Sequence, residues 1–261
     1  MKVAIVHNDY EKTLAVVDLL KTELIVRGVE LDDAEPDIVI AVGGDGTLLS
    51  AVKRYIKRIN EIKFASVHAG HLGFYSDWQD FELSELAELI SSGPQKSVSY
   101  RLLKLTLTRE SKKEVLYALN EATLKCDNSR TLMASVTIDD IFFENFRGDG
   151  LSVSTPSGST AYNKSLGGAV IHPSLNALQL TEIASINNRV FRTLGSPTIV
   201  GTNQVIKIDV KAHQTYMLNY DQSLNHYDDL KSVEFQISNK KVNFIADNHL
   251  PFWARVRDAF I

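Results

Sequence analysis

The stretch Asp37-Ile-Val-Ile-Ala-Val-Gly-Gly-Asp-Gly-Thr47 is the strongest indication of the fold of the first part of the chain. It begins as a short apolar run, typical of a buried strand, and continues as a glycine-rich turn. The residues that follow, from 47 to 58, have the pattern of a helix. Further apolar runs at 2–6 and 64–67 predict strands, and amphipathic segments at 10–27 and 81–90 predict helices. Apolar strands that alternate with helices predict a parallel sheet covered on both faces, a Rossmann-like α/β domain.

The pattern changes after Ser91-Ser-Gly-Pro94, where closely spaced strands replace the alternation. We expect strands at 100–109, 115–125, 134–139, 141–147, 179–185, 204–210, 216–219, 232–237 and 241–245, with Asp139-Asp140 as a hairpin turn. This pattern predicts a mostly β second domain, a β-sandwich. The domains expected are an α/β domain over 1–98, a β-rich domain over 99–248 and a C-terminal helix over 249–261 that packs back on the first domain.

Composition excludes several classes of protein. The chain has 261 residues, of which 44% are hydrophobic and 23% charged, an ordinary globular balance. Its net charge of −4 disfavours nucleic acid as the main partner. The single cysteine, Cys126, cannot form an internal disulfide, and no apolar run is long enough to span a membrane. We therefore expect a soluble cytoplasmic protein with neither a nucleic-acid nor a membrane partner.

The turn Gly43-Gly-Asp-Gly-Thr47 lies where a strand gives way to a helix, and ligands of open α/β sheets bind at such strand ends. Glycines let the backbone approach a ligand closely, and the helix N-terminus offers N–H groups to an anion. A carboxylate beside bound phosphates can hold Mg²⁺ or accept a proton from an attacking hydroxyl. The alternative is a tight turn in which Asp45 only caps the helix. The chain has neither a G-x-x-x-x-G-K-[ST] nor a G-x-G-x-x-G motif, so it is neither a P-loop enzyme nor an ordinary dinucleotide dehydrogenase.

Two further segments suggest a site. Residues 146–162 are uncharged after Asp149 and dense in small residues and hydroxyls, which suits a polar ligand with many oxygens. Asn120-Glu121 interrupts the apolar run 115–125, and adjacent side chains on a strand point to opposite faces. One of this polar pair therefore enters a packed region or a site, or else the strand lies at an edge with both groups solvated.

These segments, in this order, resemble the NAD kinases, and in particular the bacterial ATP/polyphosphate NAD kinases. The resemblance runs through Gly43–Thr47, His68-Ala-Gly-His-Leu-Gly-Phe74, Asn120-Glu121, Arg147-Gly-Asp-Gly150 and Ser154–Tyr162, and ends near Tyr220-Asp-Gln222. The GGDG turn alone is a weak signal, since lipid kinases and phosphofructokinases are similar there. The long Ser/Thr/Gly segment together with Asn-Glu is a strong one.

The resemblance implies ATP-dependent phosphorylation of the 2′-hydroxyl of the adenosine ribose of NAD, giving NADP. The first domain would then bind the phosphoryl donor and the β-rich domain the dinucleotide. Asp45 would accept the hydroxyl proton, and Phe74 would form an aromatic wall of the pocket. Arg147 and Asp149 would serve the NAD site of a neighbouring subunit, because family members are homo-oligomers, here a dimer or a tetramer.

The residues expected to bind substrate are Asp45, Gly46, Phe74, Asn120, Glu121, Arg147, Asp149, Ser157, Thr160, Ala161, Tyr162, Asn163, Lys164, Ser165, Ala184 and Gln222. Those expected to bind phosphate are Gly43, Gly44, Gly46 and Thr47. A divalent cation, Mg²⁺ or Mn²⁺, and ATP as donor are the expected cofactors. We expect no resident metal site, because His68 and His71 lack further ligands and are better interpreted as hydrogen-bonding loop residues. At Gln222 the sequence departs from the Asp-Gly common in the family, a difference that would change ligand preference at the pocket rim.

Two other functions remain open at this point. A kinase for another alcohol, a lipid or a sugar would share the GGDG turn but has no use for a dinucleotide-like segment at 147–162. A non-catalytic NAD(P)-binding sensor would keep the pocket without needing Asp45.

Overall fold

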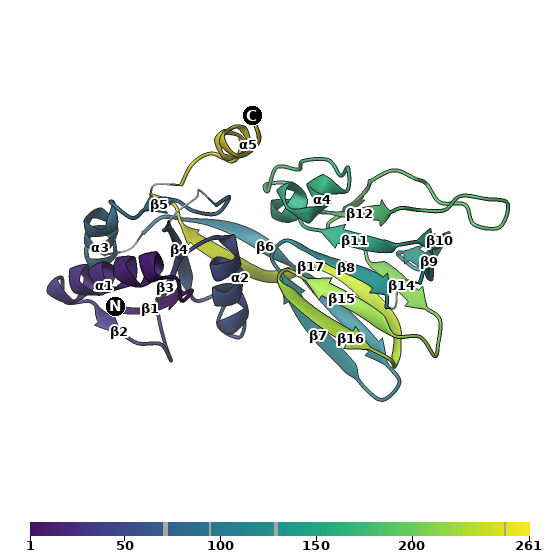
Figure 1. Cartoon of the computed structure of the whole chain (residues 1–261), viewed down its shortest axis with the longest axis horizontal. Coiled ribbons are helices and arrows are strands. Elements are labelled where there is room, and N and C mark those ends of the chain that lie inside the picture. The colour runs from purple at the N-terminus through teal and green to yellow at the C-terminus, as the bar shows by residue number, and fades with distance from the viewer. Residues whose placement is uncertain (70–72, 94, 128–129, 248) are drawn as a thin grey trace. The chain divides into compact units, whose positions relative to one another are not determined.

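The structure is a computed structural model that describes residues 1–69, 73–93, 95–127, 130–247 and 249–261 (Figure 1). The chain divides into two units, of which unit 1 comprises Met1–Tyr100 and Lys240–Ile261, and unit 2 comprises Arg101–Asn239. Two long strands, β6 (Ser97–Arg109) and β17 (Leu230–Ile245), continue from one unit into the other.

Unit 1 is the α/β domain that the alternating pattern predicted. Its remaining elements are β1 (Lys2–His7), α1 (Glu11–Val26), β2 (Glu30–Leu31), β3 (Ile38–Val42), α2 (Asp45–Arg54), β4 (Lys63–His68), β5 (Trp78–Gln79), α3 (Leu83–Ser91) and α5 (Phe252–Phe260). The strand order is β17-β4-β3-β1-β2, with β5 also beside β4, and these pairs are parallel. Residues 240–247 were expected in the second domain but belong to unit 1, because Asn243 and Phe244 of β17 pair with β4.

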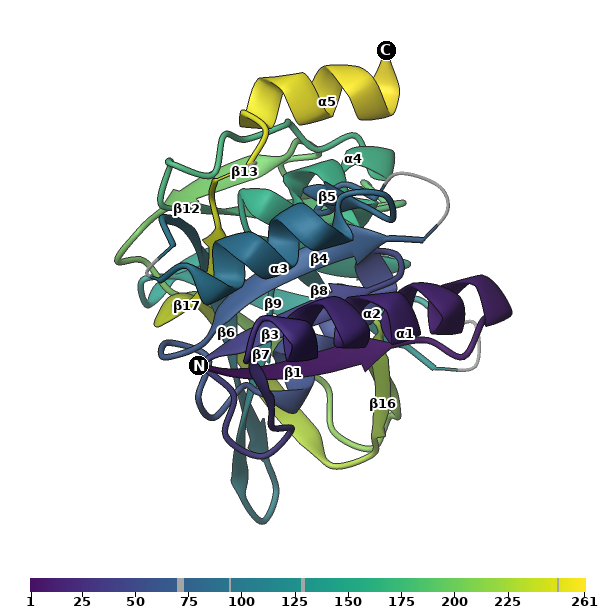
Figure 2. The same ribbon diagram turned by 90° about the vertical axis from the view of Figure 1, so that its left-hand side faces the viewer.

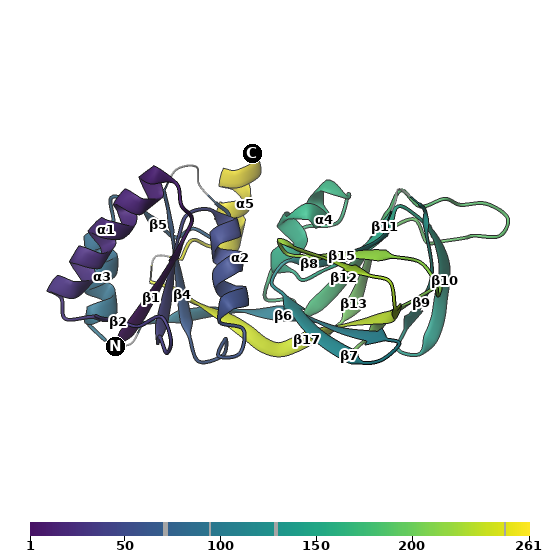
Figure 3. The same cartoon turned by 60° about the horizontal axis from the view of Figure 1, so that its bottom comes forward.

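Helices cover both faces of this parallel sheet. Helices α1 and α3 lie side by side on one face (Figure 2), and α2 lies on the opposite face (Figure 3). Leu20 of α1 and Leu86 of α3 are fully buried in one core with Ile38 and Ile40 of β3. Strands buried on both faces explain why β3 is apolar at every position.

Unit 2 is a β-sandwich, as predicted. Its remaining elements are β7 (Lys113–Ala118), β8 (Glu121–Cys126), β9 (Leu132–Ile138), β10 (Ile141–Gly148), β11 (Gly150–Ser154), the 3-10 turn η1 (Ser157–Thr160), α4 (Tyr162–Ser165), β12 (Ala177–Ile183), β13 (Thr198–Gly201), β14 (Ile206–Val210), β15 (Tyr216–Tyr220) and β16 (Ser223–Tyr227). One antiparallel layer has the order β13-β12-β11-β8-β15-β16. In the other, β10-β9-β14-β17 are antiparallel, and β6 lies between β17 and β7.

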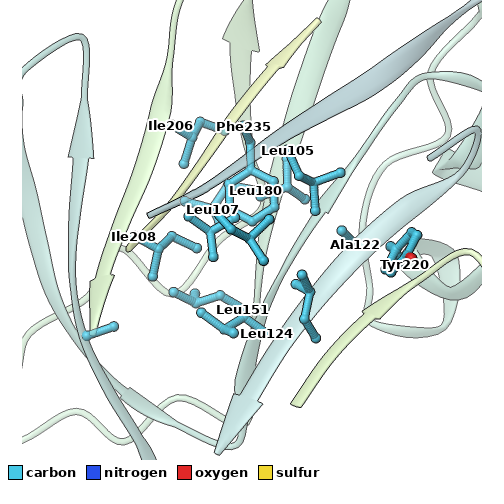
Figure 4. Close-up of a cluster of buried hydrophobic side chains, with 14 of the residues drawn as sticks. Leu105, Leu107, Ala122, Leu124, Leu151, Leu180, Ile206, Ile208, Tyr220 and Phe235 are labelled. Carbon is cyan, nitrogen blue, oxygen red and sulfur yellow. The ribbon is translucent and has the colours of Figure 1, made fainter. Parts of the chain in front are cut away.

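The core of unit 2 lies between these two layers. Leu105, Ile208 and Phe235 from one layer meet Leu124 and Leu180 from the other (Figure 4). Every one of these side chains is almost fully buried. Each buried aliphatic or aromatic side chain contributes about 1.5–3 kcal/mol to folding relative to an exposed one.

The hairpin between β9 and β10 turns at Asp139 and Asp140, as the sequence predicted. Both residues have positive φ, 49° and 61°, the left-handed pair that a two-residue type I′ turn requires. None of the helices that the structure describes is long and apolar enough to span a membrane.

Candidate active site

The glycine-rich turn lies at the carboxyl end of β3, where helix α2 begins at Asp45 with Gly44 as its N-cap residue. Gly43 has a φ of +145°, and a Cβ at this position would lie 2.4 Å from Oγ1 of Thr47. Only glycine therefore fits beneath the Thr47 side chain. Gly44 and Gly46 are exposed, and Asp45 and Thr47 are half-buried, so the turn presents backbone to solvent at a helix N-terminus.

Asp45 does not cap the helix, which was the alternative open from the sequence. Its Oδ2 accepts the backbone N–H of Phe74 at 2.9 Å, and its Oδ1 accepts that of Tyr75 at 3.0 Å. No side-chain cap bond is made at the start of α2. A Cβ on Gly73 would lie 2.5 Å from Oδ1 of Asp45, so the segment 73–75 approaches the carboxylate as closely as a glycine permits. The carboxylate is thus held by a segment distant in sequence, and Phe74 lies directly beside it.

Asn120 and Glu121 are buried, at 7% and 9% exposure, where the chain passes from β7 to β8, so the single strand expected over 115–125 is wrong and the segment forms two strands in different layers. Strand β8, which Glu121 begins, lies between β11 and β15, so the alternative of a solvated edge strand is wrong. Both backbone groups of Asn120 are hydrogen-bonded. Its N–H donates to Oδ1 of Asp221 at 2.8 Å, and its carbonyl accepts from the N–H of Thr155 at 2.9 Å.

The hydroxyl-rich segment 146–162 passes directly over Asn120. The Thr155 hydroxyl donates to the carbonyl of Leu119 at 2.6 Å, and the Ser157 hydroxyl reaches the same carbonyl at 3.2 Å. A Cβ on Gly158 would lie 2.1 Å from the carbonyl oxygen of Asn120, so no larger residue fits without moving backbone. The segment is therefore packed against Asn120 and does not form a free loop.

A pocket of about 500 Å³ opens on the face of β8 and β15 that points away from the core. Residues alternate along a strand, so Ala122 and Leu124 face the core while Glu121 and Thr123 face the pocket. The lining residues are Glu121, Thr123, Lys125, Tyr162, Met217, Asn219, Asp221 and Leu224. Tyr162 is 41% exposed, and the Lys125 ammonium lies 5.7 Å from the centre of its ring. A flat ring, a cation and carboxyl groups in one pocket of this size suit a polar, ring-containing ligand.

The two carboxyl groups of this pocket have raised pKa values. Burial, and then the nearby charge of Asp221, raises the pKa of Glu121 to about 8. Burial raises the pKa of Asp221 to about 6, against the effect of the N–H groups of Leu119 and Asn120 that donate to it. Oε2 of Glu121 is buried without a hydrogen-bond partner among the described residues. An unpartnered buried carboxyl oxygen at a pocket wall is a feature that a ligand can satisfy.

Arg147, Asp149 and Ala184 gather at the other end of strand β11. The N–H of Asp149 donates to the carbonyl of Ile183 at 2.9 Å, and the Arg147 guanidinium lies 5.5 Å from the centre of the Phe191 ring. Ala184 has a positive φ of 47° and is exposed. Because Gly150 pairs with Lys125 and Ser154 with Glu121, the length of β11, about 13 Å, separates this group from Glu121.

The remaining expected residues differ in exposure. Lys164 and Ser165 of α4 are exposed next to the half-buried Ala161, and Gln222 is exposed in the turn between β15 and β16. Thr160 is buried in η1. Asn163 is fully buried and its Oδ1 accepts from the Thr181 hydroxyl at 2.7 Å, so its side chain holds α4 against β12.

Among the described residues, no group of three or more His, Cys, Asp or Glu side chains is arranged to hold a metal ion. His68 is buried at the end of β4, whereas His71, the other histidine of that loop, lies outside the described residues.

Comparison with known families decides the assignment. The family model for the ATP-NAD kinase N-terminal domain matches residues 3–94, and that for the ATP-NAD kinase C-terminal domain matches residues 119–246. The chain belongs to the NAD kinase family. It is accordingly an enzyme of the phosphotransferase class.

Relatives within the NAD kinase family match over the whole chain. An NAD kinase of Enterococcus faecalis is 50% identical, with 100% of this chain and 99% of the relative covered. An NAD kinase of Lactobacillus gasseri is 50% identical over 100% of this chain and 98% of its own length. NAD kinase 1 of Listeria monocytogenes is 47% identical, with 94% of each chain covered.

Two solved structures share the fold. The yeast NADH kinase, crystallised with NADH, has a TM-score of 0.82 at 20% identity and covers 100% of this chain and 87% of its own. An NAD kinase from Archaeoglobus fulgidus, in complex with ATP, has a TM-score of 0.76 at 21% identity and covers 98% of this chain and 99% of its own. The chain thus has the fold of NAD kinases.

Sequence reasoning missed most of the pocket on β8 and β15. Of its lining, only Glu121 and Tyr162 were expected, whereas Thr123, Lys125 and Asn219 were not. The signal available was the alternation of β8: once Ala122 and Leu124 are assigned to the core, Thr123 and Lys125 must face the other side.

Proposed function

We propose that the chain transfers the γ-phosphoryl group of ATP to the 2′-hydroxyl of the adenosine ribose of NAD, giving NADP, with Asp45 as the acceptor of the hydroxyl proton. The observation that carries the proposal is the Asp45 carboxylate at the carboxyl end of β3, fixed by the amides of Phe74 and Tyr75 beside a glycine-rich helix N-terminus. Phosphoryl transfer needs mainly positioning and charge neutralisation. The fixed carboxylate would supply the positioning, and the helix N-terminus would supply charge neutralisation.

Unit 1 would bind the phosphoryl donor. The exposed backbone of Gly44 and Gly46, with Gly43 and Thr47 shaping the turn, offers N–H groups to phosphate oxygens at the start of α2. Each oxygen of Asp45 accepts one backbone N–H and keeps a lone pair free for a substrate hydroxyl.

A divalent cation, Mg²⁺ or Mn²⁺, would accompany the donor. Mg²⁺ is usually held by one or two carboxylates together with substrate phosphates and water, and the half-buried Asp45 carboxylate fits that donor set. When bound, the cation would neutralise charge on the phosphate oxygens during transfer.

Unit 2 would bind the dinucleotide. The support is the pocket of about 500 Å³, in which Tyr162 can stack on a base and Glu121 has an unpartnered oxygen for a polar group of the ligand. Asn120 precedes Glu121, and Ser157, Thr160 and Ala161 lie in the segment that packs against Leu119 and Asn120. Asn163, Lys164 and Ser165 belong to α4, which the pocket residue Tyr162 begins, and Gln222 follows the pocket residue Asp221. The buried Asn163 and Ser157 would shape the pocket wall, whereas the exposed Tyr162, Lys164 and Ser165 would contact ligand.

Arg147 and Asp149 would contact the dinucleotide of a neighbouring subunit in a homodimer or homotetramer, and Ala184 would contact the far end of the dinucleotide. Their support is the family resemblance together with their position, a strand's length away from Glu121. A cytoplasmic location is supported by the single, buried Cys126, since a chain without disulfides suits a reducing compartment.

The test is a coupled assay. Purified protein is incubated with NAD, ATP and Mg²⁺, and the product is detected with a dehydrogenase that accepts NADP and not NAD. Product is expected with ATP, and polyphosphate in place of ATP tests the second donor. If neither donor gives NADP while calorimetry shows that NAD binds, the proposal is wrong and the chain is a dinucleotide sensor.

A further inference from the structure

A buried polar cluster joins the start of helix α5 to the segment that holds Asp45. Its members are Asp77, Arg255 and His249, whose side chains are 3%, 5% and 11% exposed. His249 Nδ1 lies 2.9 Å from Oδ2 of Asp77, and its Nε2 lies 2.8 Å from the hydroxyl of Tyr100. All of these residues belong to unit 1. None is among the residues expected to bind substrate.

Arg255 is the centre of this cluster, because each nitrogen of its guanidinium has its own acceptor. Nε donates to the carbonyl of Leu250 at 3.1 Å, Nη1 donates to the carbonyl of Phe74 at 2.7 Å, and Nη2 bonds with Asp77. A planar guanidinium with a fixed fork of donors can serve three acceptors at once, and a lysine ammonium cannot reproduce that geometry.

The contact of Arg255 with Phe74 connects this cluster to Asp45, the proposed catalytic group. The carbonyl of Phe74, which accepts from Arg255, and the N–H of Tyr75, which donates to Oδ1 of Asp45 at 3.0 Å, belong to one planar peptide group. A cation bonded to the carbonyl fixes the plane of that peptide and strengthens the N–H at its other end as a donor. The Phe74 N–H donates to the second oxygen of Asp45 at 2.9 Å, so movement of this peptide moves both anchors.

Helix α5 also holds the side chain of Phe74. The rings of Phe74 and Phe252 pack edge to face with centres 5.9 Å apart. The Tyr75 ring stacks on that of Phe244, with ring centres 5.8 Å apart. The segment 73–75 is therefore clamped from the C-terminal part of the chain, by a guanidinium on its backbone and aromatic rings on its side chains.

We propose that Arg255 is a positioning residue for catalysis, which acts through the Phe74–Tyr75 peptide to orient the Asp45 carboxylate. This inference rests on the proposed function, in which Asp45 accepts the hydroxyl proton. It makes helix α5 part of the catalytic apparatus through its contacts with the segment 73–75.

The test is a double-mutant cycle that uses Arg255→Lys, Arg255→Ala and Asp45→Asn. Arg255→Lys keeps a positive charge beside Asp77 and protects the fold, in case Arg255→Ala does not fold. Arg257→Ala is the matched control, because Arg257 lies on the same helix, is exposed and pairs only with Asp258 among the contacts that the structure gives it. NADP formation is measured at several NAD and ATP concentrations, so that kcat and KM are separated.

We expect Arg255→Lys to lower kcat about 10- to 100-fold with little change in KM, the size of effect that a misplacement near 1 Å produces. In the Asp45→Asn background, the same substitution should lower the residual rate less than twofold, because the group that it positions is already gone. Arg257→Ala should behave as wild type in both backgrounds.

Backbone amide shifts give a readout independent of activity. In Arg255→Lys, the amide protons of Phe74 and Tyr75 should move upfield as their bonds to Asp45 weaken, while amides of β1 stay in place. If Arg255 only neutralises Asp77, Arg255→Lys keeps both the amide shifts and kcat.

The outcomes separate the two proposals. If Asp45→Asn alone turns over at a normal rate, the proposed function fails, and this inference fails with it. If Asp45→Asn is slow but Arg255→Lys has normal kcat, or slows the Asp45→Asn background by the same factor as the wild type, the inference is overturned and the proposed function stands.

Discussion

At the level of single residues, the carboxyl groups of Asp45 and Glu121 lie in different environments. Asp45 is half-buried and held by two backbone amides, the arrangement of a group that is fixed in place while one face stays accessible. Glu121 is buried beside Asp221, and its pKa is raised to about 8. A carboxyl with that pKa is largely protonated at neutral pH and can donate a hydrogen bond to a ligand.

The raised pKa of Glu121 implies that the free energy of unfolding depends on pH. In the folded chain its carboxyl keeps its proton up to about pH 8, whereas in the unfolded chain it ionises above its ordinary pKa of 4.5. The unfolded state therefore binds fewer protons between these values, and the free energy of unfolding falls as pH rises, by at most about 1.4 kcal/mol per pH unit. Asp221 contributes in the same sense only up to about pH 6.

Glu121→Gln should therefore flatten the fall in stability of the ligand-free protein between pH 6 and 8. Urea unfolding at half-unit pH steps measures this, with the exposed Glu110→Gln as the matched control. Parallel curves for Glu121→Gln and wild type across this window would show that burial does not perturb Glu121.

At the scale of elements, helix α5 offers a matched pair of neighbouring aromatic residues. Phe252 is 6% exposed and packs on Phe74, whereas Trp253 is 57% exposed. Phe252→Ala should cost about 3–5 kcal/mol, as for other buried aromatic side chains. Trp253→Ala should stay within about 1 kcal/mol, since most of its ring is already in solvent. Thermal unfolding compares the two variants, and equal losses would mean that α5 does not dock through its Phe252 face.

The elements that the sequence could predict are those with a clear period. The apolar runs of unit 1 and the Asp139-Asp140 hairpin follow from local patterns, and the structure contains them. Strand β11, at Gly150–Ser154, was not predicted, because its glycine, serines and position inside a hydroxyl-rich stretch resemble a loop. It is a central strand all the same, since Leu151 and Val153 fill the core and Ser152 bonds to Thr123 across the pair with β8.

Pairing between distant segments could not be predicted from the sequence, because local patterns do not show which segments meet. The expected strands 232–237 and 241–245 are one continuous strand, β17, because the polar residues between them keep an extended backbone as the chain leaves unit 2. The bonds of Asp45 to Phe74 and Tyr75, and of Arg255 to Phe74, join segments that no local pattern connects. The candidate residues were therefore predictable by residue type and by resemblance, but the hydrogen bonds that hold Asp45 in place were not.

For the whole molecule, the proposed exchange of residues between subunits can be tested by mixing. Asp149 lies a strand's length from Glu121, and in the proposal it serves a neighbour's NAD site. Asp45→Asn and Asp149→Ala should each be nearly inactive alone. A mixed dimer would contain one site with both residues intact and one with neither.

Refolding the two variants together should therefore restore up to about a quarter of wild-type activity, since half of the randomly formed dimers are mixed and each has one complete site. The activity of the mixture is compared with the sum of the two variants refolded separately. No gain on mixing, in a sample shown by light scattering to be oligomeric, would mean that Asp149 acts within its own subunit.

The role of Asp45 is tested by the turnover number of Asp45→Asn with NAD and ATP, measured beside that of Asp33→Asn, a change at an exposed acid of the same unit. Asparagine keeps the shape of Asp45 but cannot accept the hydroxyl proton, so kcat should fall about 10²- to 10⁴-fold with the fold intact. Asp33→Asn should keep the wild-type rate. A folded Asp45→Asn protein that turns over within about twofold of wild type would contradict the assignment of Asp45 as the proton acceptor.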